Sequence, residues 1–211
     1  AIASTASKEN NDLTANSLTN TGGQVSAGTL LNANIAQTVS NSGGVIASND
    51  ALTLKAGTLN NDNGQVASTK AGATITSTNA ISNVKGKLQA ATDLKITGNG
   101  LNNTDGIANA ATVAVNTQNQ ALTNTRGQLT GDDVTISSGA LLNDGAGLIQ
   151  GTNTLAINTN GQTLTNADSG ASGGITSGGT LNIQSGDLTN SAGYIAGKDV
   201  TTINAAQINN G

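Results

Sequence analysis

The sequence predicts an all-β fold, a right-handed parallel β-helix (solenoid) of about 20-residue coils, with about nine to ten coils stacked. An apolar residue followed two positions later by Asn recurs along the chain at steps of 20 to 24 residues. Short stretches of alternating apolar and polar residues complete each period, as in strands with one buried face. About twenty residues are too few for two sizeable helices but enough for two or three short strands and tight turns.

Each coil begins with one apolar residue, here called the anchor. We place the anchors at Leu18, Val39, Leu59, Ile81, Leu101, Leu122, Leu142, Leu164, Leu188 and Ile208. Two positions after them stand Asn20, Asn41, Asn61, Asn83, Asn103, Asn124, Asp144, Asn166, Asn190 and Asn210. Stacked coils align these residues, so the sequence predicts a structural ladder of side-chain amides at one corner. Simple turn propensity remains the alternative, and the near-constant position favours the ladder.

A glycine stands five positions after most anchors, and an apolar residue stands seven after. The predicted structural turn glycines are Gly23, Gly44, Gly64, Gly86, Gly106, Gly127, Gly147 and Gly193. The residues at the seventh position are Val25, Ile46, Val66, Leu88, Ala108, Leu129, Ile149 and Ile195. We expect the glycines to adopt a turn conformation that other residues avoid.

Each coil ends in an alternating apolar pair, which predicts a strand with one buried face. The pairs are Leu52/Leu54, Ala73/Ile75, Leu94/Ile96, Val113/Val115, Val134/Ile136, Leu155/Ile157 and Leu181/Ile183. The stretch 167–174 (ADSGASGG) adds about four residues, after which Ile175 resumes the apolar role; we interpret it as a bulging turn. The usual crossover rule predicts right-handed winding.

The array is expected to occupy residues 18–211, with residues 1–17 forming the end of a preceding coil. We interpret the chain as a stretch excised from a longer filament.

Composition argues against an ordinary globular domain. The chain has no Phe, Trp, Met, Pro, Cys or His, and Tyr194 is its only aromatic residue. Missing Cys excludes disulfides and thiolate metal sites. With a net charge of −4 and scattered basic residues, densest at Lys85 and Lys87, we expect no nucleic-acid partner and no membrane insertion.

The motif L-x-N-x-x-G-x-[ILV] resembles the hemagglutinin-type repeats of filamentous exoproteins. Clear examples are residues 59–67 (LNNDNGQVA) and 122–129 (LTNTRGQL). That family includes filamentous hemagglutinin adhesins and CdiA-like contact-dependent inhibition toxins, and the resemblance extends from about Leu13 to Gly211.

The resemblance implies two-partner secretion through an outer-membrane pore protein and display at the surface of a Gram-negative bacterium. It implies a structural rod that projects a binding or toxin region, with any host or neighbouring-cell receptor bound by other regions. The alternative is that the rod surface itself binds host glycans, matrix or sister filaments. No amino-terminal secretion domain or carboxy-terminal toxin is recognisable in this stretch.

Few residues are suited to catalysis or metal binding, and we predict no catalytic, cofactor-binding or metal-binding residues. Asp93, Asp133 and Asp199 precede terminal pairs on non-adjacent coils, without His or aromatic residues to support glycoside hydrolysis. Glu9 and the scattered Asp residues do not converge into a calcium site. Lys95 interrupts the threonine row that an ice-binding face would need. We expect Tyr194 to point outward, either as an incidental surface residue, the favoured interpretation, or as a contact.

Overall fold

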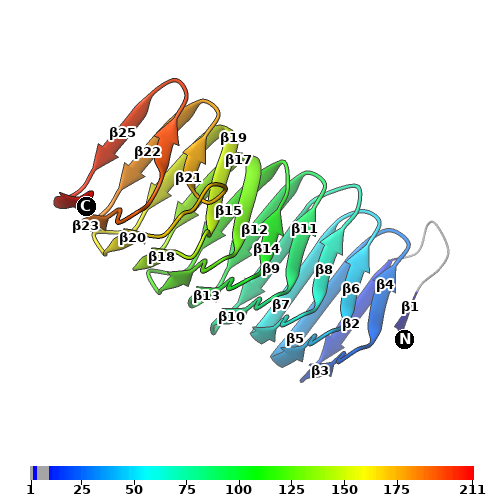
Figure 1. The fold of residues 1–211 in the computed structure, drawn as a ribbon. Helices are drawn as coiled ribbons and strands as arrows, with labels where there is room; N and C mark the ends of the chain where they lie inside the picture. The colour runs from blue at the N-terminus through cyan, green and yellow to red at the C-terminus, as the bar shows by residue number, and fades with distance from the viewer. Residues whose placement is uncertain (1, 4–9) are drawn as a thin grey trace.

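The protein is a rod of parallel strands in a computed structural model that describes residues 2–3 and 10–211 (Figure 1). Residues 1 and 4–9 lie outside the described part, and with them Lys8, Glu9 and much of the segment 1–17 assigned to a preceding coil. The described strands stack in about nine turns with a spacing of about 21 residues, and they include no helix. The predicted all-β solenoid is therefore confirmed.

Three faces make up each coil, and the first carries the anchors. This anchor face contains β3 (Leu18–Thr19), the ends of β5 (Leu31–Ser40) and β7 (Leu52–Asn60), β10 (Ile81–Ser82), β13 (Leu101–Asn102), β16 (Leu122–Thr123), β18 (Leu141–Asn143), β20 (Leu164–Asn166), β23 (Asp187–Thr189) and β26 (Gln207–Asn209).

The second face follows the asparagine corner. It contains β1 (Ile2–Ala3), β4 (Gln24–Ala27), β6 (Val45–Ser48), β8 (Gln65–Ser68), β11 (Lys87–Ala90), β14 (Ile107–Asn109), the starts of β17 (Gln128–Ser137) and β19 (Leu148–Asn158), β21 (Gly174–Ser177) and β24 (Ile195–Gly197).

The third face carries the terminal pairs. It contains β2 (Asn11–Ala15), the starts of β5 and β7, β9 (Ala73–Ser77), β12 (Asp93–Thr97), β15 (Thr112–Asn116), the ends of β17 and β19, β22 (Thr180–Gln184) and β25 (Thr201–Asn204). The four long strands β5, β7, β17 and β19 bend from one face into the next.

Equivalent residues lie above one another because every strand pairs in parallel with its counterpart one coil away. Leu101, for example, lies between Ile81 and Leu122. Ile175 lies between Ile149 and Ile195, so the chain returns to register after the stretch 167–174.

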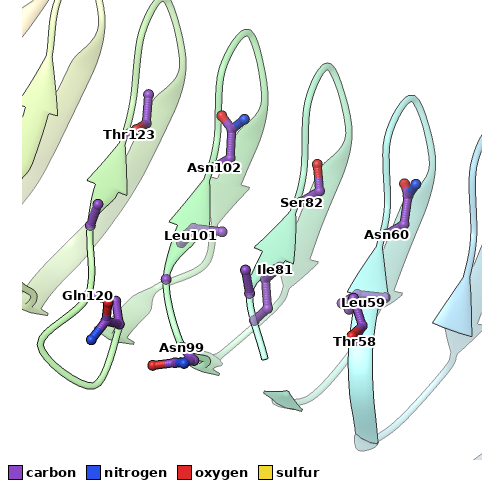
Figure 2. Close-up of a pocket in the computed structure, with 13 residues that line it drawn as sticks. Thr58, Leu59, Asn60, Ile81, Ser82, Asn99, Leu101, Asn102, Gln120 and Thr123 are labelled. Atoms are coloured by element: carbon purple, nitrogen blue, oxygen red, sulfur yellow. The ribbon is translucent and has the colours of Figure 1, made fainter. Parts of the chain in front are cut away.

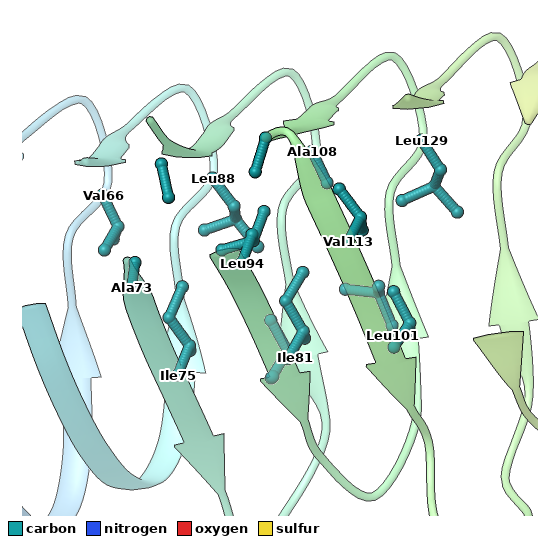
Figure 3. Packing of buried hydrophobic residues seen from close by; sticks show 14 of the residues in the cluster. Val66, Ala73, Ile75, Ile81, Leu88, Leu94, Leu101, Ala108, Val113 and Leu129 are labelled. Carbon is teal, nitrogen blue, oxygen red and sulfur yellow. The ribbon is translucent and has the colours of Figure 1, made fainter. Parts of the chain in front are cut away.

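Aliphatic side chains fill the interior of the rod (Figure 3). Val66, Leu88, Ala108 and Leu129 project inward from the second face, opposite Leu94 and Val113 of the third. Each fully buried Leu, Ile or Val contributes about 1.5–3 kcal/mol relative to an exposed position. One coil alone cannot bury these side chains, so stacking supplies the core.

The anchor of the seventh coil is Leu141, and the prediction of Leu142 is wrong by one position. Leu141 lies opposite Leu122 and is 2% exposed, whereas Leu142 lies opposite Thr123 and points outward. Two adjacent leucines allow two registers in the sequence, and burial of the strand's inner face decides between them.

Two further inward columns, which the sequence analysis did not identify, consist of small residues except for Ile35. The corner between the second and third faces holds Ala27, Ser48, Ser68, Ala90, Ala110, Gly131, Gly151, Ser177 and Gly197. The corner after the third face holds Ile35, Ala56, Ser77, Gly98, Thr117, Ser138, Thr159 and Ser185. These residue types are common elsewhere in the chain, so only their placement in the fold distinguishes them.

Candidate functional site

An unbroken ladder of asparagine side chains runs along one corner of the rod. Each Nδ2 donates a hydrogen bond to the Oδ1 of the next coil's asparagine at 2.7–2.8 Å. The members are Asn20, Asn41, Asn61, Asn83, Asn103, Asn124, Asn143, Asn166, Asn190 and Asn210. All eight asparagines named as ladder residues from the sequence lie in it.

The ladder amides also bind the backbone on both sides of the corner. Asn103 Nδ2 lies 3.2 Å from Gly106 O in its own coil and 3.2 Å from Gln128 O in the next. From Asn41 to Asn166 these side chains are fully buried, where an unpaired amide would be costly. From Asn20 to Asn124, each ladder amide therefore joins the backbone of its own coil to that of the next.

Asp144 does not belong to the ladder, although the sequence analysis placed it there, two positions after the predicted anchor Leu142. Asn143 takes the position because Leu141 is the anchor, and its Nδ2 donates to Asn166 Oδ1 at 2.8 Å. One extra residue then separates the asparagine from Gly147, whose oxygen accepts a hydrogen bond at 2.9 Å.

The glycines after the ladder are required for close approach, and the predicted special backbone conformation is wrong. None of the eight has a positive φ. An added Cβ at Gly44 would instead overlap the backbone oxygen of Asn20 and lie 2.7 Å from Asn41 Oδ1. The same overlap occurs at Gly64, Gly86, Gly106, Gly127, Gly147 and Gly193. Coil-to-coil packing leaves no room for a side chain there.

The residue before each of these glycines takes the left-handed conformation in most coils. Its φ is 60° at Gly22, 56° at Lys85 and 54° at Arg126. Arg126 makes a bidentate contact with Asp105 one coil below, with Nε–Oδ1 and Nη2–Oδ2 distances of 2.7 and 2.8 Å. This hydrogen bond to Arg126, with the nearby charge of Lys85, lowers the pKa of the Asp105 carboxyl.

The carboxylates examined for catalysis do not form an acid–base pair. Asp93 and Asp133 share a column on the third face with Thr112 between them, and Asp199 lies outside that column beside Gly179. Asp133 Oδ1 accepts hydrogen bonds from Thr154 Oγ1 at 2.6 Å and Asn153 Nδ2 at 2.9 Å, which lower its pKa. A carboxyl with a lowered pKa is ionised at neutral pH and is a poor general acid.

Within residues 2–3 and 10–211, no group of three or more His, Cys, Asp or Glu residues is placed to hold a metal ion. The same described part of the chain contains no helix that is long and apolar enough to cross a membrane.

Tyr194 points outward beside the bulging turn, with 56% of its surface exposed. Its backbone N–H donates to Ser169 Oγ at 3.0 Å, and its carbonyl accepts from Asn166 Nδ2 at 3.1 Å. Ser169 is buried, so the turn 167–174 packs against the next coil through this backbone.

A shallow groove on the anchor face crosses four coils (Figure 2). It is lined by Thr58, Leu59, Asn60, Ala80, Ile81, Ser82, Asn99, Gly100, Leu101, Asn102, Gln120, Ala121 and Thr123. Figure 2 shows Asn60, Ser82, Asn102 and Thr123 in a row on successive coils. None of the lining residues is charged, so the groove offers hydrogen-bonding groups without an ionic contact.

No known protein family, curated protein or solved structure matches this chain. The fold and its ladder therefore rest on the coil geometry described above.

Proposed function

We propose that the chain is a rigid rod segment of a secreted filamentous exoprotein of the hemagglutinin-repeat type. In this proposal the parent is an adhesin or a contact-dependent toxin-delivery protein, exported through an outer-membrane pore partner and displayed on a Gram-negative cell. The observation that carries the proposal is the ladder unbroken from Asn20 to Asn210. A stack of about nine coils spaced about 4.8 Å apart is about 43 Å long, and a rigid rod of this length can separate the regions at its two ends.

The neighbour-only contacts of the coils support export in an unfolded state. Each coil bonds only to the coils beside it, so coils can fold in turn as they leave a pore, and folded coils oppose backsliding. Replacing Asn61, Asn83 and Asn103 by Ala in an exported parent should slow secretion. Unchanged secretion of such a variant, shown to be destabilised in vitro, would contradict this part of the proposal.

The spacer role can be tested by removing whole coils. Deletion of residues 59–100 joins Thr58 to Leu101 in register and should shorten the rod by about 10 Å without unfolding it. Solution scattering measures the length of the rod. A ligand-binding domain fused to one end, with the other end fixed to a surface, measures how far the rod reaches by its binding to a target held on a second surface. A deletion of 59–90, which breaks the register, is the matched control. Reach that does not change with rod length would contradict the spacer role.

The second candidate function is adhesion by the rod surface, which the anchor-face groove favours. Asn60 Nδ2, Asn102 Nδ2 and the side-chain amides of Asn99 and Gln120 make no hydrogen bond to other described residues. The purified chain should be tested for binding to epithelial cells, bacterial cells and glycans at physiological salt. Saturable binding that Asn102→Ala with Gln120→Ala abolishes would favour adhesion over the spacer role.

A further inference from the structure

Asparagine followed directly by glycine recurs in the sequence. The pairs are Asn63–Gly64, Asn99–Gly100, Asn160–Gly161 and Asn210–Gly211. In such a pair the backbone nitrogen of the glycine can attack the side-chain carbonyl carbon of the asparagine, because glycine has no Cβ to obstruct the approach. The attack needs a backbone N–H and a carboxamide that are both free to move. The surrounding hydrogen bonds therefore decide which pair can react.

Hydrogen bonds restrain three of these pairs. Gly64 N donates to Asn61 O at 2.9 Å, so the attacking nitrogen is engaged in the turn. Asn160 Nδ2 donates to Ser138 O at 2.9 Å, which holds the carboxamide in place. Asn210 Oδ1 accepts a ladder hydrogen bond at 2.7 Å. In each of these pairs the reaction must first break a hydrogen bond.

The Asn99–Gly100 pair has no such restraint. Gly100 N and the side-chain amide of Asn99 make no hydrogen bond to any other residue among 2–3 and 10–211. The Asn99 side chain is exposed at the edge of the anchor-face groove, where water has access to it (Figure 2). Gly98 N and Asn99 N do make hydrogen bonds to neighbouring coils, but these bonds do not involve the reacting atoms. Asn99 is therefore the asparagine whose surroundings permit the reaction.

We propose that Asn99 is a site of spontaneous covalent modification, in which Gly100 N attacks Asn99 Cγ and closes a succinimide ring. The new N–Cγ bond replaces the Cγ–Nδ2 bond. Gly100 N gives its proton to solvent, and the amide nitrogen takes up a proton and leaves as ammonia. Water then opens the ring: cleavage at Cγ leaves aspartate, and cleavage at the backbone carbonyl carbon of Asn99 leaves isoaspartate. Water is the only co-reactant, and the reaction requires no catalytic residue.

The products change the groove and the strand that follows it. Either product places a carboxylate among lining residues that carry no charge. Isoaspartate also lengthens the main chain by one atom directly before β13. Leu101 N donates to Ala121 O at 3.0 Å, and Gly100 O accepts from Ile81 N at 3.0 Å, so the added atom disturbs hydrogen bonds to both neighbouring coils. This inference does not rest on secretion, on the spacer role or on adhesion.

Peptide mapping of the native chain by mass spectrometry tests the selectivity. During incubation at mildly alkaline pH, Asn99 should convert to the acid at least about tenfold faster than Asn63 or Asn160. In the chain unfolded in urea, all three should convert at similar rates, because the hydrogen bonds that restrain them are lost. Similar rates in the folded chain would overturn the proposal. So would a folded Asn99 that stays unmodified for as long as the unfolded chain takes to convert.

Enzymatic methylation of isoaspartate by a protein isoaspartyl methyltransferase identifies the product. The aged native chain should incorporate methyl groups, and Asn99→Gln should lose most of this labelling, because the longer side chain closes its ring far more slowly. Asn160→Gln removes the amide of a restrained pair and should leave the labelling nearly unchanged. Circular dichroism shows whether both variants are folded. Equal loss in the two variants, or full labelling of Asn99→Gln, would overturn the proposal.

Discussion

The asparagine corner and the other two corners of the coil differ in which positions stay constant. The ladder asparagine follows its anchor by two positions in every coil, including Leu141 and Asn143. Seven positions separate Leu59 from Val66, and the same number separates Leu101 from Ala108. The next corner takes seven positions from Val66 to Ala73 but five from Ala108 to Val113.

The hydrogen bonds explain this difference. At the asparagine corner each amide binds the next coil, so a change of length between the anchor and the asparagine would disturb two coils. At the corner after the third face, Thr117, Ser138 and Thr159 donate to carbonyls of their own turn. Bonds between coils also occur at that corner, as from Ser77 Oγ to Gly57 O. The ladder bonds therefore fix the position of each asparagine relative to its anchor, while the remainder of a corner can vary in length.

The two departures from constant length at the asparagine corner support this conclusion. The extra residues after Asn143 and Asn166 lie between the asparagine and the second face. The ladder bonds on either side of Asn166 remain at 2.8 and 2.7 Å. The corner thus accommodates insertions that leave the amide in place.

The largest expected effect comes from a side chain at the close-approach glycine. Gly44→Ala should destabilise the protein by about 3 kcal/mol or more, because its Cβ overlaps Asn20 O. Gly43→Ala is the matched control: its φ is 62°, nothing lies within 4 Å, and strain should cost about 1–2 kcal/mol. Urea unfolding measures both, and equal midpoints would refute the close-approach explanation.

Breaking the ladder should have the next largest effect. Asn103→Ala removes the bond to Asn124 and leaves Asn83 Nδ2 without its side-chain acceptor, at a cost of about 2–3 kcal/mol. Ser77→Ala, at the corner after the third face, loses one bond to Gly57 O and should cost about 1 kcal/mol. Hydrogen exchange should show the Asn103→Ala loss in coils on both sides; loss confined to one coil would contradict a continuous ladder.

Lengthening the corner after the third face should have a smaller effect. One glycine inserted after the exposed Gln118 should cost less than about 1 kcal/mol, because longer surface loops add little closure entropy. The same insertion between Asn102 and Asn103 displaces the amide from the ladder and should cost several times more. Thermal unfolding of the two variants provides the comparison, and similar melting temperatures would show that the corners are equivalent.

The smallest expected effect is the pH dependence from Asp105 on the asparagine corner. Arg126 lowers the pKa of this carboxyl in the fold below the ordinary value of 3.8, so its ionised form stabilises the folded state. This stabilisation is fully present above pH 3.8 and is lost as the pH falls through the lower folded pKa. Asp105→Asn should therefore make stability slightly less sensitive to acid, as urea titrations between neutral and low pH would show. A larger loss of stability in acid for the variant than for the native protein would contradict the prediction that ionised Asp105 stabilises the fold.

Much of the architecture was predictable because the coils repeat the same residues at the same positions. The anchors, the terminal pairs and the ladder asparagines recur often enough for their register to be recognised in one sequence. The prediction of the seventh anchor was wrong, because Leu141 and Leu142 fit the apolar anchor position equally well in the sequence. Burial of Leu141 against Leu122 resolved the register and moved the ladder from Asp144 to Asn143.

The sequence alone determined the all-β class, the coil length and the inward columns of large aliphatic residues, since period and hydrophobicity are properties of the chain itself. The tertiary structure decided why the ladder glycines are required and which Ser, Thr and Ala residues line the other corners. Those properties depend on distances between neighbouring coils and on the direction of side chains at each turn. Neither follows from residue types that are as common on the surface of this rod as in its interior.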